Sequence, residues 1–247
     1  MYEQHTGNLF VHHDIALPAF PLCLAHGDIS LTGTAGNFCA VGTFNPGIEI
    51  WNLDVLNALE PSCILGGEDT SMADDILRHQ MGGSKLSKKT KAPGMRHGSH
   101  TGAVMALSWN KVHRQVIASG SADHTVKIWD VTHADTDQCN AGTFSHHKDK
   151  VQAVSWHPSE GTLLATGGYD KVLALVDARS QDSVRRVRLP ADCEALSWDP
   201  FSSQYLTAAS EDGTIQCWDV RKFTDKQSVW SVVAEEYGGV SGLCYNP

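Results

Sequence analysis

The sequence predicts an all-β protein made of repeated units, and three observations support this prediction. Six of the seven tryptophans fall into two series with a shared spacing, since Trp109, Trp156 and Trp198 lie 47 and 42 residues apart. Short apolar runs alternate with polar residues at a period of two and are separated by Gly and Asp turns, as in strands. No segment has the pattern of a long amphipathic helix. A recurring period of this length indicates a repeat architecture.

The second tryptophan series follows the first at a fixed distance. Trp129 and Trp218 each lie 20 residues after a tryptophan of the first series, and position 176, where a third member would stand, is a valine. Each copy holds a short apolar run, a turn with Asp or Asn, and an alternating run, which predicts strand, turn and strand. The aligned copies are residues 41–52, 119–130, 166–177 and 208–219.

Composition and charge narrow the class of protein. The 247 residues carry 19 Lys and Arg against 28 Asp and Glu, a net charge of −9, and 41% are hydrophobic, which is ordinary for a folded domain. No apolar run approaches the roughly 18 residues of a membrane-spanning helix, which argues against an integral membrane protein, and the first residues show no secretory signal. Seven cysteines without a CxxC pair favour free thiols in a reducing compartment.

The repeats resemble the WD-repeat β-propellers, whose blades are four-stranded sheets of about 40 to 45 residues. In that family a His before the first strand, a Ser or Thr, a turn Asp and the Trp form a buried hydrogen-bonded set. The second blade has all four residue types, the third has lost the Trp, and the fourth keeps only the last two. The resemblance therefore implies a structural hydrogen-bond network of His100, Ser119, Asp123, Trp129, His147, Thr166, Asp170, Asp212 and Trp218.

The repeats divide the chain into predicted blades and one insert. The predicted ranges are a first blade with an N-terminal strand at 1–65, a flexible acidic-then-basic insert at 66–99, three blades at 100–144, 145–189 and 190–236, and the start of a fifth blade at 237–247. A seven-bladed ring at this period needs roughly 300 residues. Without the 34-residue insert 213 residues remain. We therefore expect about four blades plus part of a fifth, as a fragment of a seven-bladed ring.

Three stretches of sequence narrow the resemblance further. Residues 8–22, 40–43 and 48–55, together with the lysine-rich insert, are similar to the periodic tryptophan proteins, a ribosome-biogenesis group of the WD-repeat family. This resemblance implies a non-enzymatic scaffold without a cofactor, located in the nucleus and nucleolus, that assists large-subunit assembly and rRNA processing. The implied partners are pre-ribosomal assembly factors or ribosomal proteins, and no membrane.

The insert carries opposite charges in its two halves. Residues 60–75 contain five acidic and no basic residues, whereas residues 76–100 contain six basic and no acidic residues. Its glycines, serines and proline favour a flexible loop. One hypothesis is an arm that contacts rRNA phosphates. A nucleolar targeting segment and a solvated loop without a partner are the alternatives. The candidate RNA contacts are Lys85, Lys88, Lys89 and Lys91.

One group of residues has the composition of a catalytic triad. His100, Ser119 and Asp123 supply the required base, nucleophile and acid. The same residue types recur at blade-specific offsets, and in this blade they occur together with Trp129. Such a recurrence indicates a structural set, because buried polar groups need partners in every blade. The sequence therefore predicts no catalytic residue.

Two pairs of adjacent histidines suggest metal ligands. The pairs are His12–His13 and His146–His147. Adjacent residues of a strand point to opposite faces, so we expect at most one histidine of each pair to face a given site. The sequence therefore predicts no metal site.

A short motif after the third strand leaves two further functions open. Trp218 begins a Trp-Asp-x-Arg motif that ends at Arg221, and its latter half is repeated at Arg179. The motif resembles those of WD-repeat substrate receptors of cullin-type ubiquitin ligases, so both arginines are candidate ligase-adaptor contacts; local pairing with Asp is the alternative. The other function is a chromatin or histone-binding adaptor, since propellers can hold peptide tails. The sequence does not separate these functions, because partner contacts lie on loops.

Overall fold

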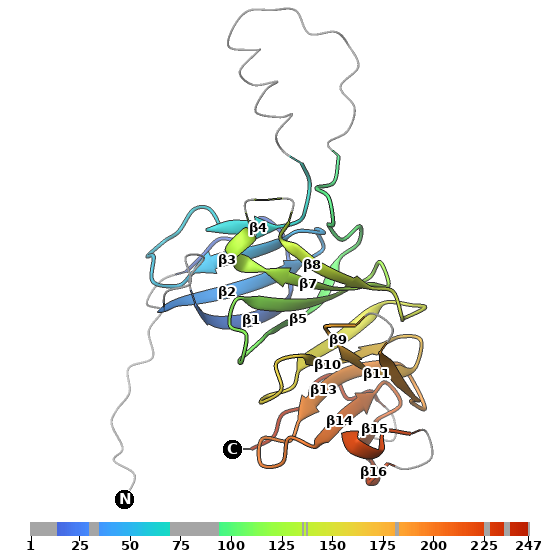
Figure 1. Cartoon of the computed structure of the whole chain (residues 1–247). Coiled ribbons are helices and arrows are strands. Elements are labelled where there is room, and N and C mark those ends of the chain that lie inside the picture. The colour runs from blue at the N-terminus through green and yellow to red at the C-terminus, as the bar shows by residue number, and fades with distance from the viewer. Residues whose placement is uncertain are drawn as a thin grey trace, which may run out of the picture.

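The structure, a computed structural model, describes residues 14–29, 35–69, 94–134, 136, 138–180, 183–224, 228–234 and 238–246. Within these ranges the chain forms four antiparallel sheets of four strands each and two short 3-10 helices, Val131–His133 and Val220–Lys222 (Figure 1). The predicted all-β class is confirmed. No helix in this part of the chain is long and apolar enough to cross a membrane.

Each sheet consists of four strands that follow one another in the chain. The first sheet contains β1 (Pro21–Ile29), β2 (Ala35–Thr43), β3 (Ile48–Asn52) and β4 (Cys63–Leu65). The second contains β5 (Val104–Trp109), β6 (Val116–Ser121), β7 (Val126–Asp130) and β8 (Asn140–Phe144). The third contains β9 (Val151–Trp156), β10 (Leu163–Gly168), β11 (Val172–Asp177) and β12 (Val184–Arg188). The fourth contains β13 (Cys193–Trp198), β14 (Tyr205–Ser210), β15 (Thr214–Asp219) and β16 (Trp230–Val233).

The turn between the second and third strands explains the Asp of the repeat. In Asp123, Asp170 and Asp212 the side-chain Oδ1 accepts a hydrogen bond from the backbone N–H two residues further on, at 2.9, 3.2 and 3.1 Å. The residue that follows each Asp has a positive φ, of 67°, 60° and 82° in the same order. An Asp side chain that bonds its own turn in this way stabilises a tight chain reversal. The Asp is therefore a turn former as well as a network residue.

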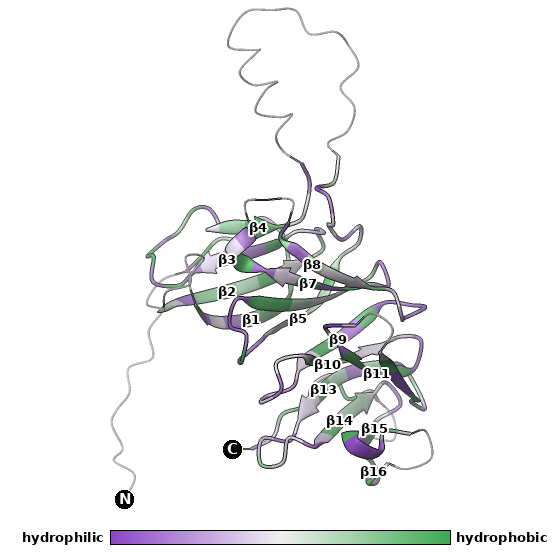
Figure 2. Ribbon diagram, in the orientation of Figure 1, coloured by the Kyte–Doolittle hydropathy of each residue, from purple (hydrophilic) through white to green (hydrophobic). Residues whose placement is uncertain are grey.

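The hydrophobic core lies between neighbouring sheets. Because side chains alternate between the two faces of a strand, each sheet presents apolar residues to the sheet before it and to the sheet after it. The first strands lie against one another in chain order, β1 against β5, β5 against β9 and β9 against β13. Apolar residues gather on the strands and polar ones on the loops (Figure 2). The three buried clusters include Ile50 with Trp129, Ile128 with Trp156, and Leu173 with Trp218.

Three glycines at one repeat position allow neighbouring sheets to approach each other closely. They are Gly42 in β2, Gly120 in β6 and Gly167 in β10, and each faces the first residue of the next sheet. A Cβ atom on Gly120 would lie 2.7 Å from a side-chain carbon of Val151, and one on Gly167 would lie 2.3 Å from the sulfur of Cys193. Both distances are shorter than van der Waals contact, so these positions require glycine for close packing.

The segment 238–246 lies beside the fourth sheet. The hydroxyl groups of Tyr245 and Thr207 are 2.6 Å apart, and the N–H of Val240 donates to the carbonyl of Ser210 at 3.4 Å. Within the described residues this segment forms no strand. Its assignment to a fifth blade, like the division of the chain into blade ranges, stays a prediction.

The close approach at Gly120 leads to a stability prediction. Gly120→Ala should lower the free energy of unfolding by about 1–3 kcal/mol, because the added methyl group would push β6 away from β9. The matched control is Gly142→Ala on β8, where the nearest atom to the new methyl would be 3.7 Å away. We expect the control to change stability by no more than about 0.5 kcal/mol in urea denaturation. Equal stabilities of the two variants would contradict the packing argument.

Candidate functional site

The second sheet contains a hydrogen-bonded chain of four side chains. His100, in the segment before β5, lies with Nδ1 2.9 Å from Asp123 Oδ2 and with Nε2 2.7 Å from Ser119 Oγ. The indole N–H of Trp129 donates to the same Ser119 Oγ at 2.7 Å. The chain links the entry segment, the second strand, the turn and the third strand of the sheet. The structure thus brings together all four residues singled out in this blade.

The partners of each atom fix where the protons lie. Asp123 is a carboxylate that can only accept, so His100 Nδ1 carries a proton and donates to it. Ser119 Oγ accepts the N–H of Trp129 and gives its own O–H to His100 Nε2. Burial lowers the pKa of His100, although the adjacent Asp123 opposes this effect. Burial opposes ionisation of Asp123 too, but hydrogen bonds from His100 and Thr125 hold the pKa of its carboxyl group well below the usual range.

This geometry does not suit nucleophilic catalysis. Ser119 is 0% exposed, and both the proton and a lone pair of its hydroxyl group are already used inside the sheet. A serine nucleophile needs an oxygen that a substrate can reach. The arrangement satisfies buried polar groups instead, which fixes how loop, strand and turn pack.

The third sheet replaces its missing tryptophan with a histidine. His147 lies with Nδ1 3.0 Å from Asp170 Oδ1 and with Nε2 2.9 Å from Thr166 Oγ1, as His100 does in the second sheet. Val176 has no N–H to offer the hydroxyl group. In its place His146 Nε2 lies 2.8 Å from Thr166 Oγ1. His146 therefore serves as the second donor to this hydroxyl group.

The expectation that only one of His146 and His147 can face a given site is wrong. The two residues precede β9 and are not part of a strand, so both rings reach Thr166 and lie 4.4 Å apart between centroids. Sequence reasoning missed His146 for this reason. The available signal was an extra histidine next to the blade histidine in the one copy that lacks the tryptophan. In the described part of the chain no group of three His, Cys, Asp or Glu side chains could hold a metal ion.

The first and fourth sheets solve the same problem differently. In the first, the hydroxyl position is Val41, and the indole N–H of Trp51 donates at 3.0 Å to Glu49, a buried carboxylate on the same strand. In the fourth, Trp218 is buried whereas Asp212 is exposed, and no hydrogen bond joins them among the described residues. The structure therefore does not bring together the two network residues predicted for this blade.

The two candidate ligase-adaptor arginines pair locally. Arg179 donates Nε to Asp177 Oδ1 at 3.0 Å and Nη2 to Oδ2 at 2.7 Å. Arg221 makes the same fork with Asp219, at 2.9 and 2.6 Å, which lowers the pKa of Asp219 to about 2. Both guanidinium groups are exposed, and their role in adaptor binding stays a prediction.

The ends of the insert lie together beside the second sheet. The N–H of Asp69 donates to the carbonyl of Gly94 at 2.7 Å, and the N–H of Arg96 donates to the carbonyl of Gly67 at 2.9 Å. Ser99 Oγ accepts the N–H of Gly67 at 2.7 Å, directly before His100. The insert is therefore anchored at its base to the network. The candidate RNA contacts Lys85, Lys88, Lys89 and Lys91 lie outside the described residues.

Comparison with known proteins follows the same repeats. The family model described as "WD domain, G-beta repeat" matches residues 93–130, 139–177 and 186–219. The chain belongs to the WD-repeat family. A chain in the "Crystal Structure of Mitotic Checkpoint Complex" shares this fold with a TM-score of 0.57 at 24% identity, over 85% of this chain and 51% of that chain.

Two relatives narrow the family. The chain is 37% identical over 246 residues to Periodic tryptophan protein 1 of Saccharomyces cerevisiae, which covers 96% of this chain and 41% of the relative. It is 27% identical over 197 residues to the Ribosome biogenesis protein WDR12 homolog of Nematostella vectensis, which covers 78% of this chain and 44% of the relative. The resemblance to the periodic tryptophan proteins is confirmed. The chain spans less than half of the length of these two relatives.

The buried donor in the third sheet leads to a pH prediction. Burial lowers the pKa of His146 from 6.5 to about 3, and His147 and Arg186 act in the same direction. The unfolded chain therefore binds a proton below about pH 6.5 that the folded chain does not bind until about pH 3, so stability present above this window falls as the pH drops. His146→Gln keeps an N–H for Thr166 but does not titrate. We expect a shallower loss of unfolding free energy for this variant between about pH 7.5 and about pH 5.

The control for this experiment is His113→Gln, at an exposed histidine in a loop. Urea denaturation of this variant should show the wild-type dependence on pH. A His146→Gln variant with the wild-type pH dependence would show that His146 is not held neutral in the folded chain.

Proposed function

We propose that this protein is a non-enzymatic WD-repeat scaffold in ribosome biogenesis, which assists assembly of the large ribosomal subunit and rRNA processing in the nucleolus. The observation that carries the proposal is similarity to Periodic tryptophan protein 1 across 96% of the chain. The relative from Nematostella vectensis, named as a ribosome biogenesis protein, supports the same process. Partners would be pre-ribosomal assembly factors or ribosomal proteins.

The geometry supports a scaffold because it combines a fixed interior with exposed loops. The buried networks tie the entry segment and the turn to the strands of the second and third sheets, so the loops at this end have a defined position. Large apolar side chains are exposed on other loops, among them Leu59 at 92%, Phe201 at 77% and Phe44 at 63%. Aromatic and aliphatic side chains displayed in this way are typical anchors of protein interfaces.

The basic half of the insert is the proposed contact with rRNA. Its anchored base lies beside His100, and the lysine-rich residues 85–91 belong to the chain between the two ends of that base. The protein as a whole has a net charge of −9, so any contact with RNA phosphates depends on local positive charge.

Affinity purification of the full-length protein from cells tests the proposed function. We expect enrichment of large-subunit ribosomal proteins, assembly factors and pre-rRNA, with accumulation of unprocessed rRNA when the protein is depleted. Enrichment of histones without ribosomal proteins would replace the proposal with a chromatin adaptor. Enrichment of a ligase adaptor that is lost in Arg221→Ala would replace it with a ubiquitin-ligase receptor.

The same purification tests the insert. Replacing Lys85, Lys88, Lys89 and Lys91 with alanine removes four positive charges from one segment of the chain. We expect less ultraviolet crosslinking to pre-rRNA, because each lost phosphate contact weakens binding to RNA. Co-purification of protein partners should be retained and serves as the internal control. Unchanged crosslinking would contradict the proposed role of the insert.

A further inference from the structure

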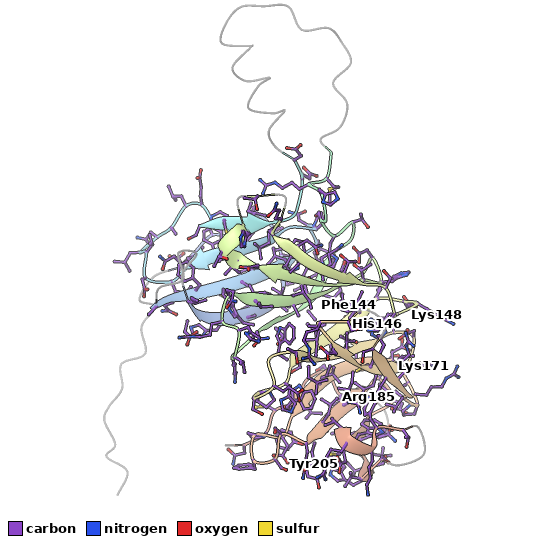
Figure 3. The ribbon with its side chains drawn as sticks, in the orientation of Figure 1. Phe144, His146, Lys148, Lys171, Arg185 and Tyr205 are labelled. Atoms are coloured by element: carbon purple, nitrogen blue, oxygen red, sulfur yellow. The ribbon has the colours of Figure 1, made fainter. Side chains whose placement is uncertain are left out.

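A pocket of about 480 Å³ lies over one face of the third sheet. Its lining includes His146 and Lys148 from the segment before β9, Asp170 from the turn, and Arg186 and Arg188 from the outer strand β12. His146 and Lys148 are labelled in Figure 3 at the same end of this sheet. The pocket is separate from the basic insert, which belongs to the connection between the first and second sheets.

The pocket exists because the third sheet departs from the repeat at two positions on one face. Next to the hydroxyl position, the other sheets carry the long polar side chains Glu49, Lys127 and Gln216, whereas the third sheet has Ala174. Two residues along the same strand, the tryptophan position is Val176. Residues i and i+2 of a strand point to the same face, so both truncations open space on that face.

The face with the truncations is the face that carries positive charge. The register pairs Thr166 with Ala174 and Ala174 with Arg186, which aligns the arginine with the opened space. Arg186 and Arg188 alternate along β12, so their backbone positions are about 7 Å apart on one side of the sheet. This distance is comparable with the step between successive phosphates of an extended single strand of RNA.

The positive side chains outnumber the negative charge that is available to them. The Asp170 carboxylate already accepts hydrogen bonds from the His147 ring and from the backbone N–H groups of Lys148 and Val172. The side chains of Lys148 and Arg186 are exposed and form no salt bridge with a residue that the structure describes. The pocket therefore suits an anion that can reach both cations.

The wall of the pocket also offers an acceptor for a hydroxyl group. His146 uses its Nε2–H for Thr166, so its Nδ1 is a lone-pair acceptor, and this atom is buried without a partner among the described residues. A ribose 2′-OH next to a phosphate supplies the matching donor, and this hydroxyl group distinguishes RNA from DNA. We propose that the pocket binds the ribose–phosphate backbone of single-stranded RNA; the choice of RNA among phosphate ligands rests on the proposed function.

Binding of a fluorescein-labelled oligouridylate to the purified chain tests the proposal by fluorescence anisotropy. The double variant Lys148→Ala/Arg186→Ala should bind about tenfold more weakly than wild type, with a salt dependence reduced by about 1.4 logarithmic units for two lost phosphate contacts. The matched control Lys111→Ala/Lys222→Ala removes two exposed lysines outside the pocket and should change affinity less than about twofold.

A second variant separates the pocket from general charge. Ala174→Gln introduces the residue that the fourth sheet has at this position and fills the space without changing the net charge. It should weaken RNA binding by a similar factor while the unfolding transition is retained. Deoxyuridylate of the same length should bind wild type more weakly than the RNA does. Insert lysine variants should keep the difference between the wild-type pocket and the pocket variants.

Wild-type RNA affinity in both pocket variants would overturn the proposal. Binding of inorganic phosphate or of a phosphoserine peptide that depends on the pocket, with no such dependence for RNA, would also overturn it. In either case co-purification with pre-ribosomal particles remains a separate result, so failure of the pocket and failure of the proposed function can be told apart.

Discussion

Each sheet of this protein buries polar atoms between two apolar neighbours, and the need to pair those atoms constrains the rest of the structure. In the second sheet the pairing runs from Trp129 through Ser119 and His100 to Asp123, and every proton has one place in it. An unpaired donor or acceptor in such a core costs about 1–3 kcal/mol. The network therefore determines which loop conformation, strand register and turn are compatible with close packing of the sheets.

The departures from the repeat show how this constraint acts. Where the hydroxyl group is lost, Glu49 accepts the indole N–H of Trp51. Where the indole is lost, His146 supplies an N–H to Thr166. The second replacement has a further effect, because a histidine from a loop does not fill the volume of a tryptophan on the strand. The third sheet thus combines a satisfied hydroxyl group with an open, positively charged pocket, whose proposed use is RNA binding.

The sequence was sufficient for the parts of the structure that follow from local periodicity. The tryptophan spacing and the turn Asp predicted the repeated strands, and the second-blade residues His100, Ser119, Asp123 and Trp129 lie together as that resemblance implied. The roles of His146 and Glu49 were not predicted, because they depend on the path of a loop and on side-chain reach across a sheet. The pocket was not predicted either, since it requires the register of Ala174 against Arg186. A motif defines the common network, but only three-dimensional neighbours define its substitutes.

The account rests on one arrangement of protons, and nitrogen NMR of the histidine rings measures it directly. In spectra of the folded chain near neutral pH, His100 and His147 should be neutral with the proton on Nδ1, as donors to Asp123 and Asp170. His146 should be neutral with the proton on Nε2, as donor to Thr166. A cationic His146 ring, or a neutral one protonated on Nδ1, would contradict the claim that this histidine replaces the missing tryptophan.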